Sequence, residues 1–360
     1  MKKKSLGTID PKRTYPAPRS SMTPTPGPLN LITDIDGLVV GHAEAANQLT
    51  GVTVLIPERP AITAIDQRGG APGTRETDVF TAENSIDVCH AVVFSGGSAF
   101  GLDSAAGVQR WLFERGSGFA VGKTHIPIVP CAVIFDLFAN STDATQPTVD
   151  YRELGRIACE QSSQRFLLGN AGAGYGAIAG ELKGGTGSAS LSDPQNDYMV
   201  GAIAVVNSAG SPVVPGSSTF WAWPFEQHNE LGGQLAPKYP DNLEPHFPRN
   251  LGPAAHTTLV AVATDAPLTS NQTKRLAIMA QDGLARALRP VHAPQDGDTV
   301  FALSTTGTID AAATVSIEIL ARLGALAADC TARAIARGVF EAESTTGTVS
   351  YRDKFVVNNN

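Results

Sequence analysis

Short apolar runs bounded by glycine or proline alternate along the chain with longer stretches of helical periodicity. The bounded runs predict strands over 38–40, 52–56, 91–94, 199–206, 257–264 and 299–303. Apolar residues at helical spacing predict helices over 102–112, 150–165, 270–288 and 309–337, with Thr269 or Ser270 as a cap of the third. Strands and helices in this mixed order indicate a layered α/β or α+β fold, but periodicity leaves its topology open.

Three stretches lack such a pattern. Residues 1–28 are rich in proline, serine and threonine, which predicts a flexible arm. Residues 169–190 are rich in glycine. Residues 211–255 are rich in proline and contain Trp221 and Trp223, so we expect a long loop, and loops of this length are usually functional or flexible.

Composition excludes several classes of protein. Only 17% of the 360 residues are charged, against roughly 25% in typical soluble domains, which leaves room for subunit contacts. The net charge of −7, with no basic stripe, argues against a dedicated nucleic-acid binder. No apolar run reaches 18 residues, so we expect no membrane span.

The cysteines and histidines suggest neither a metal site nor a disulfide framework. The four cysteines are far apart, which is typical of thiols in a reducing compartment and predicts a cytoplasmic protein. The seven histidines show no metal-binding spacing, so we expect no metal and no cofactor.

The turn formed by Ser95, Gly96, Gly97 and Ser98 lies between a predicted strand and a predicted helix. It lacks the lysine of a phosphate-binding loop and the glycine spacing of a nucleophile elbow. Its backbone N–H groups could hold an anion or a carbonyl oxygen at the helix N-terminus. A tight turn that needs glycine for packing explains the same pattern.

Three further sites allow two interpretations each. Asp296 and Asp298 could orient an amine or share a proton, or could be solvated acids of an Asp-Gly turn. Lys183 has small neighbours that would let its ammonium group approach a substrate, but a lone lysine is usually solvated. His256 could be a base or an ordinary loop histidine.

Ten segments recur together, and in this order, in one known family. They include LITDIDGLVVGH at 31–42, SGGSAFGL at 95–102 and DGDT at 296–299. The others are 50–54, 68–74, 126–130, 171–174, 183–185, 257–258 and 282–287. The chain therefore resembles the L-aminopeptidase/D-esterase (DmpA-type) peptidases, which include β-peptidyl aminopeptidases and hydrolases of 6-aminohexanoate (nylon) oligomers.

The resemblance implies a four-layer αββα sandwich of the α+β class, similar to N-terminal-nucleophile hydrolases, formed by a single domain over 29–360. It also implies a precursor that cuts itself between His256 and Thr257 into an α part, 29–256, and a β part, 257–360. Many members have asparagine or glycine where this chain has His256. Thr257 would then be the N-terminal nucleophile.

The remaining site residues follow from the same resemblance. Asp296 and Asp298 would orient the Thr257 amine and hydroxyl, and Asn207 would donate to the oxyanion. Lys183 matches a basic residue near the nucleophile, and Phe135 aligns with an active-site tyrosine of some members. The turn at Ser95–Ser98 would line the pocket, which Trp221 and Trp223 would help to shape.

The resulting hypothesis is a self-processing aminopeptidase for short peptides, amides or esters, assembled as a homo-oligomer of four or more subunits. One alternative is an endo-acting hydrolase of oligoamides with the same nucleophile. A second alternative is an uncleaved homologue that binds small molecules without turning them over.

Overall fold

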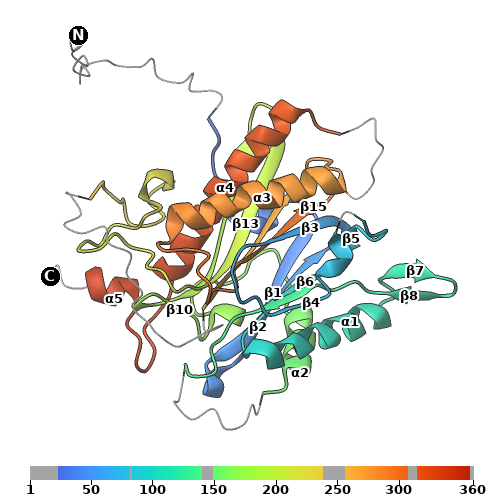
Figure 1. Cartoon of the computed structure of the whole chain (residues 1–360), viewed down its shortest axis with the longest axis horizontal. Coiled ribbons are helices and arrows are strands. Elements are labelled where there is room, and N and C mark those ends of the chain that lie inside the picture. The colour runs from blue at the N-terminus through green and yellow to red at the C-terminus, as the bar shows by residue number, and fades with distance from the viewer. Residues whose placement is uncertain (1–22, 82, 140–148, 238–255, 307–313, 357–360) are drawn as a thin grey trace, which may run out of the picture.

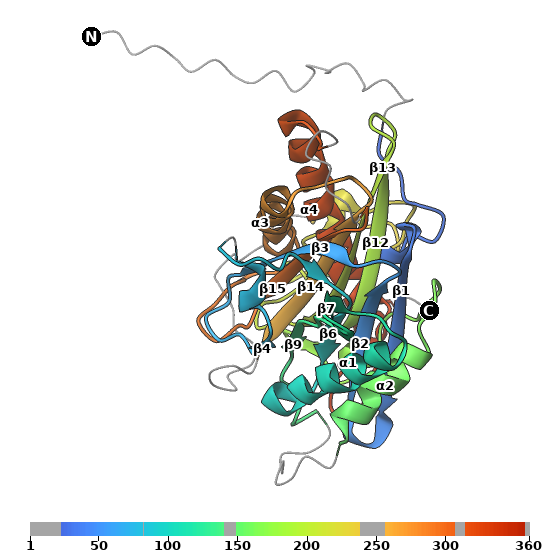
Figure 2. The same cartoon turned by 90° about the vertical axis from the view of Figure 1, so that its right-hand side faces the viewer.

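Two β-sheets lie face to face, with helices on the outer side of each (Figures 1 and 2). The computed structural model describes residues 23–81, 83–139, 149–237, 256–306 and 314–356. Most of the arm predicted over 1–28 and the part of the 211–255 loop after residue 237 lie outside these residues. Within them, no helix is long and apolar enough to cross a bilayer.

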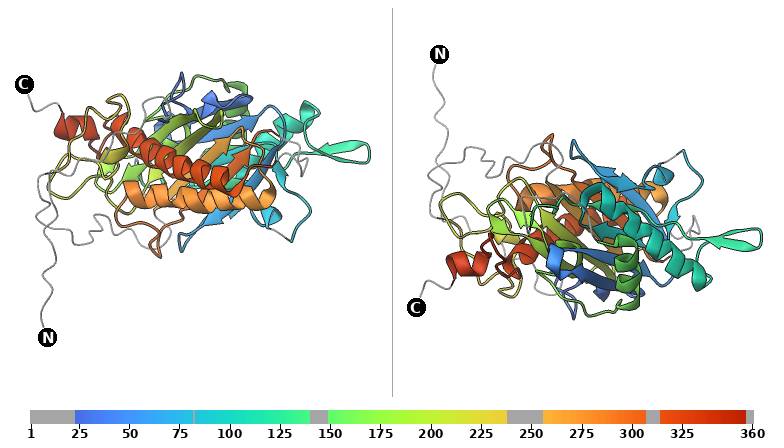
Figure 3. Two further views of the ribbon diagram at one scale, coloured as in Figure 1. Left: turned by 90° about the horizontal axis from the view of Figure 1, so that it is seen from above. Right: turned by 90° about the horizontal axis from the view of Figure 1, so that it is seen from below.

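The first sheet has five strands within the described part of the chain. In spatial order they are β1 (Leu38–Ala45), β2 (Thr50–Pro57), β6 (Val92–Ser95), β9 (Cys131–Val133) and β4 (Thr74–Arg75). The helices α1 (Ser104–Glu114) and α2 (Tyr151–Glu160) cover its outer face (Figure 2). A small hairpin of β7 (Phe119–Val121) and β8 (Thr124–Ile126) projects from this side of the molecule (Figure 3).

The second sheet has six strands in the same described residues and carries the candidate site. In spatial order they are β12 (Gly185–Asp193), β13 (Tyr198–Asn207), β14 (Thr257–Thr264), β15 (Thr299–Ser304), β3 (Ala61–Gln67) and β5 (Val88–Cys89). The helices α3 (Ser270–Ala287) and α4 (Ile317–Phe340) lie side by side over its outer face (Figure 3). A short hairpin of β10 (Ile178–Ala179) and β11 (Leu182–Lys183) precedes β12, and α5 (Tyr351–Phe355) follows α4.

The central strand β14 shows why an unbroken apolar run predicted a strand here. Leu259, Ala261 and Ala263 face the apolar layer between the two sheets. Val260 and Val262 face the layer under α3 and α4. A strand that is buried on both faces needs no alternation of apolar and polar residues. The structure thus confirms the α+β sandwich of four layers.

The helix boundaries follow local capping signals. The Thr269 hydroxyl accepts the N–H of Gln272, and the Gln272 side chain accepts the N–H of Thr269, which is a capping box at the start of α3. The predicted cap is therefore confirmed. In the described residues α4 begins at Ile317, after the cap Ser316, and the predicted start near residue 309 lies outside them.

The strands β3 and β12 were not predicted from the sequence. Six of the nine residues of β12 are glycine, serine or alanine, and glycine and alanine are depleted in strands. These small residues let α4 approach closely, since a Cβ on Gly187 would lie 2.0 Å from the carbonyl oxygen of Ala334. Packing against α4, which local propensity does not encode, explains why this glycine-rich stretch forms a strand.

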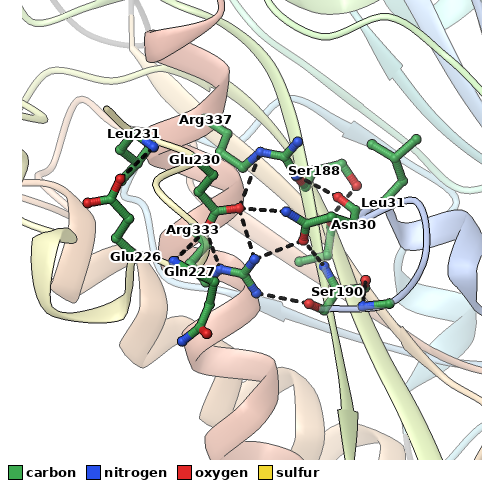
Figure 4. Close-up of polar contacts among 12 residues, drawn as sticks. Asn30, Leu31, Ser188, Ser190, Glu226, Gln227, Glu230, Leu231, Arg333 and Arg337 are labelled. Carbon is green, nitrogen blue, oxygen red and sulfur yellow. Dashed lines mark hydrogen bonds and ion pairs between the residues drawn. The ribbon is translucent and has the colours of Figure 1, made fainter. Parts of the chain in front are cut away.

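A buried polar cluster fixes the segment before η1 (Ile32–Asp34) and the loop after Trp223 against α4 (Figure 4). The guanidinium group of Arg333 donates to Glu230 from Nε at 2.5 Å and from Nη2 at 2.9 Å. It also donates to the Ser190 carbonyl at 2.9 Å and to Asn30 Oδ1 at 2.8 Å. Arg337 Nη1 donates to the Asn30 carbonyl at 2.5 Å. One carboxylate thus connects three separate segments.

Candidate active site

Residues that are far apart in the sequence meet at one end of the inner strands of the six-stranded sheet. The strands β13 and β14 are antiparallel, so the last residue of one, Asn207, pairs with the first residue of the other, Thr257. The strands β14 and β15 are parallel, and their pairing continues outward to a bridge between His256 and Asp296. Lys183 ends β11, beside the start of β12. The topology therefore brings the predicted catalytic residues together.

The peptide bond between His256 and Thr257 is buried at the start of β14. His256 is 1% exposed and Thr257 is 3% exposed. The Thr257 hydroxyl donates to the carbonyl oxygen of His256 at 2.5 Å, and the Gly297 N–H donates to the same oxygen at 2.9 Å. The hydroxyl is thus held against the carbonyl group that precedes it in the chain.

The carboxylates of the two aspartates bind backbone N–H groups, that of Asp298 beside this junction and that of Asp296 within its own turn. Asp298 Oδ1 accepts the Thr258 N–H at 2.7 Å, and its Oδ2 accepts the His292 N–H at 3.0 Å and lies 2.9 Å from His292 Nδ1. Asp296 Oδ2 accepts the Ala293 N–H at 2.8 Å. Burial and the neighbouring charge of Asp298 raise the pKa of Asp296 to about 6. His292 was not predicted from the sequence, although its position shortly before the Asp-Gly-Asp motif could have indicated it.

Asn207 joins the two sheets at the site. Its Nδ2 donates to the Phe135 carbonyl at 3.2 Å, and its Oδ1 accepts the Ile178 N–H at 3.0 Å. Phe135 follows β9 of the five-stranded sheet and is half-buried. The predicted oxyanion donor is therefore held by the backbone of Phe135, the residue that we expected to align with an active-site tyrosine of some members.

The turn at Ser95–Ser98 uses its backbone donors within the protein. The N–H groups of Gly96, Gly97 and Ser98 donate, in that order, to the Gly51 carbonyl, Asp136 Oδ1 and the Ile134 carbonyl. The Ser95 hydroxyl donates to the Gly96 carbonyl at 3.0 Å. In this structure the three N–H groups of the turn are therefore already bonded to acceptors within the protein.

Two buried ionisable side chains, Asp136 and Lys183, lie near this turn, and Asp136 accepts the Gly97 N–H. Lys183 is 1% exposed, and its Nζ donates to the Gly174 carbonyl at 3.1 Å and to the Gly184 carbonyl at 2.8 Å. Burial lowers the pKa of Lys183 to about 7, although the charge of Asp136 acts in the opposite direction. Burial raises the pKa of Asp136 to about 6. Sequence reasoning missed Asp136, although an aspartate directly after an apolar run is a usable signal.

The depressed pKa of Lys183 makes its contribution to stability depend on pH. Between about pH 7 and pH 10.4 the folded chain binds fewer protons at this lysine than the unfolded chain, so stability rises with pH in this window. We expect the free energy of unfolding of the wild type to gain at least about 1 kcal/mol over that of Lys183→Met between pH 7 and pH 9.5. Urea unfolding at both pH values measures the difference.

The matched control for this experiment is Lys123→Met, because Lys123 is exposed in the turn between β7 and β8. We expect its unfolding curves to differ from those of the wild type by the same small amount at both pH values. A constant difference between the wild type and Lys183→Met would contradict the expected role of burial.

The two tryptophans lie in different surroundings. Trp221 lines a cavity of about 630 Å³, bounded also by the β10–β11 turn, by residues 211 and 213–218 and by α5. Its ring centroid lies 5.6 Å from the guanidinium carbon of Arg289. Trp223 begins η6 (Trp223–Phe225) and is not among the described residues that line this cavity, and neither is Thr257. The two tryptophans therefore do not line the same cavity in the described structure.

The fold places the chain in a known structural class. A β-aminopeptidase of Burkholderia sp. superimposes with a TM-score of 0.67 at 22% identity, over 92% of each chain. The L-aminopeptidase D-Ala-esterase/amidase of Ochrobactrum anthropi, described as a variant of the Ntn hydrolase fold, gives 0.68 at 22% identity, over 92% of this chain and 93% of its own. These likenesses define an Ntn-hydrolase-type fold.

Sequence comparison then gives the family. The sequence profile of peptidase family S58 matches residues 30–352, and the chain belongs to this family. An uncharacterized aminopeptidase of Mycobacterium bovis is 40% identical over 353 residues, covering 91% of this chain and 98% of its own. A 6-aminohexanoate-oligomer endohydrolase of Paenarthrobacter ureafaciens is 30% identical over 277 residues, covering 76% and 74%. The expected family is confirmed, and the chain is a hydrolase of the peptidase class.

Proposed function

We propose that this chain is a self-processing aminopeptidase whose nucleophile is the Thr257 hydroxyl. The observation that carries the proposal is the contact of 2.5 Å between this hydroxyl and the carbonyl oxygen of His256, at a buried peptide bond. Attack by Oγ1 on the His256 carbonyl carbon converts the peptide into an ester. Water then hydrolyses the ester and leaves the carboxylate of His256 and a new N-terminal amine on Thr257.

The freed α-amine supplies the base for the substrate reaction. Such an amine has a pKa of about 7.7–8.0, near the optimum for a general base that works beside its own hydroxyl. Asp298 positions Thr257 through the neighbouring Thr258 N–H that it binds, and Asp296, whose carboxylate binds the Ala293 N–H in the uncut chain, orients the freed amine. Asn207 donates to the oxyanion of the tetrahedral intermediate, a role whose loss costs about 10²–10³ in rate in other hydrolases. Lys183 lies at the neighbouring strand end and adds positive charge to the site below its pKa of about 7.

Burial of the site in the continuous chain supports processing as an activation step. Thr257, Asn207, Asp296, Asp298 and Lys183 are each at most 3% exposed. In the continuous chain the Thr257 hydroxyl is buried against the His256 carbonyl. Cleavage frees His256, and its departure gives the substrate carbonyl the position that the His256 carbonyl held.

The substrates we propose are short peptides, amides or esters with a free amino terminus. The relatives named as aminopeptidases support this choice. The second candidate, an endo-acting hydrolase of oligoamides, is favoured by the 30% identical relative named as a 6-aminohexanoate-oligomer endohydrolase. In both cases Thr257 attacks the acyl carbon and no cofactor takes part.

Acetylation of the substrate separates the two candidates. An aminopeptidase recognises the free amine, so we expect N-acetylation of a tripeptide amide to lower kcat/KM by at least 100-fold, about 2.7 kcal/mol of transition-state stabilisation. Release of the first residue is followed by mass spectrometry with matched free and acetylated substrates. Equal rates on both substrates would support the endo-acting candidate. The Thr257→Ala variant gives the background rate.

We further propose that the protein is a homo-oligomer of four or more subunits in the reducing environment of the cytoplasm. Its charged fraction of 17% supports extensive subunit contacts. All four cysteines are buried free thiols, which is typical of a reducing compartment.

A further inference from the structure

We infer that the backbone N–H of Gly297 is the oxyanion donor for the cleavage of the chain's own His256–Thr257 bond. The inference rests on the proposed function, because it assigns a catalytic group to the self-processing step. The N–H lies 2.9 Å from the carbonyl oxygen that must carry negative charge when Thr257 attacks. The Thr257 hydroxyl contacts the same oxygen, so nucleophile and donor converge on one carbonyl group.

The parallel pairing of β14 and β15 places this donor. The register of the two strands, which pairs Leu259 with Thr299, is kept three residues further out at the bridge between His256 and Asp296. This brings the next N–H, that of Gly297, onto the His256 carbonyl. Sheet geometry thus supplies the hydrogen bond before any reaction begins. A donor that is already in place stabilises developing charge without reorganisation.

The turn around Gly297 is fixed from both sides. The carbonyl of Asp296 accepts the Ala71 N–H at 2.8 Å, and the Asp296 N–H donates to the Ala293 carbonyl at 2.9 Å. The Asp296 carboxylate accepts the Ala293 N–H, and the Asp298 carboxylate accepts the N–H groups of Thr258 and His292. The scissile carbonyl is bound instead by the backbone N–H of the residue between them.

Position 297 also needs glycine for a steric reason. A Cβ built on Gly297 would lie 2.5 Å from Thr257 Oγ1 and 3.1 Å from the Ala71 carbonyl oxygen. Any side chain would push the hydroxyl away from its carbonyl. The absence of a Cβ therefore lets one residue hold the carbonyl oxygen and make room for the attacking hydroxyl.

The step balances without a further reagent. Oγ1 forms a bond to the His256 carbonyl carbon, and the carbonyl π electrons move to the oxygen that Gly297 holds. When the C–N bond breaks, these electrons re-form the carbonyl, and the proton lost by Oγ1 ends on the departing nitrogen of Thr257. Water hydrolyses the ester afterwards.

Replacing the amide of Gly297 by an ester removes this donor without adding a side chain. Incorporation of glycolic acid at position 297 during cell-free synthesis removes the N–H, adds no Cβ and leaves every side chain unchanged. We expect the full-length chain to convert into its two parts about 10²–10³-fold more slowly than the wild type. Time-resolved intact-mass spectrometry measures the conversion.

The matched control is the same ester at Gly116, whose N–H donates to the Phe113 carbonyl at 3.0 Å on the exposed end of α1. It loses one backbone hydrogen bond away from the site and should be cut at the wild-type rate. Cleavage of the Gly297 ester at the wild-type rate would overturn the inference but leave Thr257 as nucleophile. An uncut wild type would overturn both the inference and the proposed function.

Hydrogen exchange gives a second measurement that does not depend on the folding of the ester variant. In the uncut Thr257→Ala chain the Gly297 N–H keeps the His256 carbonyl as its acceptor and should exchange slowly. In the cleaved wild type the acceptor has left, and we expect exchange at least 10-fold faster. Fast exchange of Gly297 in the folded Thr257→Ala chain would contradict the inferred hydrogen bond.

Discussion

The Thr257→Ala variant is expected to remain a single chain and to show no hydrolase activity, whereas the wild type separates into two pieces. Alanine keeps the Cβ but removes the only atom of this side chain that can attack the His256 carbonyl. Intact-mass spectrometry measures the outcome. In proportion to chain length, the full mass of 37.5 kDa predicts a wild-type piece of about 27 kDa for the arm with the α part, residues 1–256. The other piece, of about 11 kDa, begins at Thr257.

The neighbouring Thr258 provides the control. It is equally buried, and its N–H is bound by Asp298, but it is not adjacent to the bond that we expect to be cut. Thr258→Ala should still yield a fragment that begins at Thr257. Cleavage of Thr257→Ala at the same bond would contradict the nucleophile. A wild type that stays at full mass would favour the alternative of an uncleaved small-molecule binder.

The Glu230→Ala variant is expected to lose about 3–5 kcal/mol of folding stability, because the substitution leaves the guanidinium of Arg333 buried without its carboxylate. Arg333 is the largest fully buried side chain in the described structure, and Glu230 also binds Asn30 at 2.6 Å. The substitution removes the hydrogen bonds by which Glu230 holds its loop to α4 and to the N-terminal segment, whereas the bonds from Arg333 and Arg337 to Asn30 remain. Urea unfolding at pH 7 measures the effect.

The stability that Glu230 contributes depends on pH with a defined sign. Burial opposes its ionisation, but the hydrogen bonds and charges of Arg333 and Arg337 outweigh burial and lower the pKa of Glu230. Its contribution is therefore present above the unfolded pKa of about 4.3 and is lost as pH falls through the lower folded value. The stability gap between the wild type and Glu230→Ala should narrow accordingly in acid.

Glu114→Ala is the matched control for this prediction. Its ion pair with Arg110 lies at 2.5 Å but is exposed to solvent, and exposed pairs contribute little. We expect its unfolding midpoint to stay within error of the wild type. A small effect of Glu230→Ala at pH 7, similar to that of the control, would contradict the assigned role of the buried cluster.

Local pattern in the sequence was sufficient for several elements. The apolar run over 257–264 predicted β14 with the bounds that the structure gives. Thr269 and the periodic apolar face predicted the start of α3. These features depend on burial of a continuous run and on a cap within one turn, so neighbouring residues contain the whole signal. The ordered motifs likewise identified the family.

Contacts across large separations in sequence were beyond such reasoning. The glycines and serines of β12 form a strand because α4, more than 120 residues later, packs on them. Asp136 meets the turn at Gly97, and Glu230 meets Arg333, across separations that no spacing rule covers.

The site itself shows the same division. The sequence marked the Asp-Gly-Asp motif with its role left open, and only the resemblance to a known family named Thr257 as the nucleophile and joined the two in one mechanism. The hydrogen bond from Gly297 to the scissile carbonyl became visible only in the folded chain, because the parallel pairing of β14 with β15 creates it. Local sequence pattern indicates where a strand begins. Which strand it pairs with, in which register, and where a side chain has room are decided only when the sheet is packed.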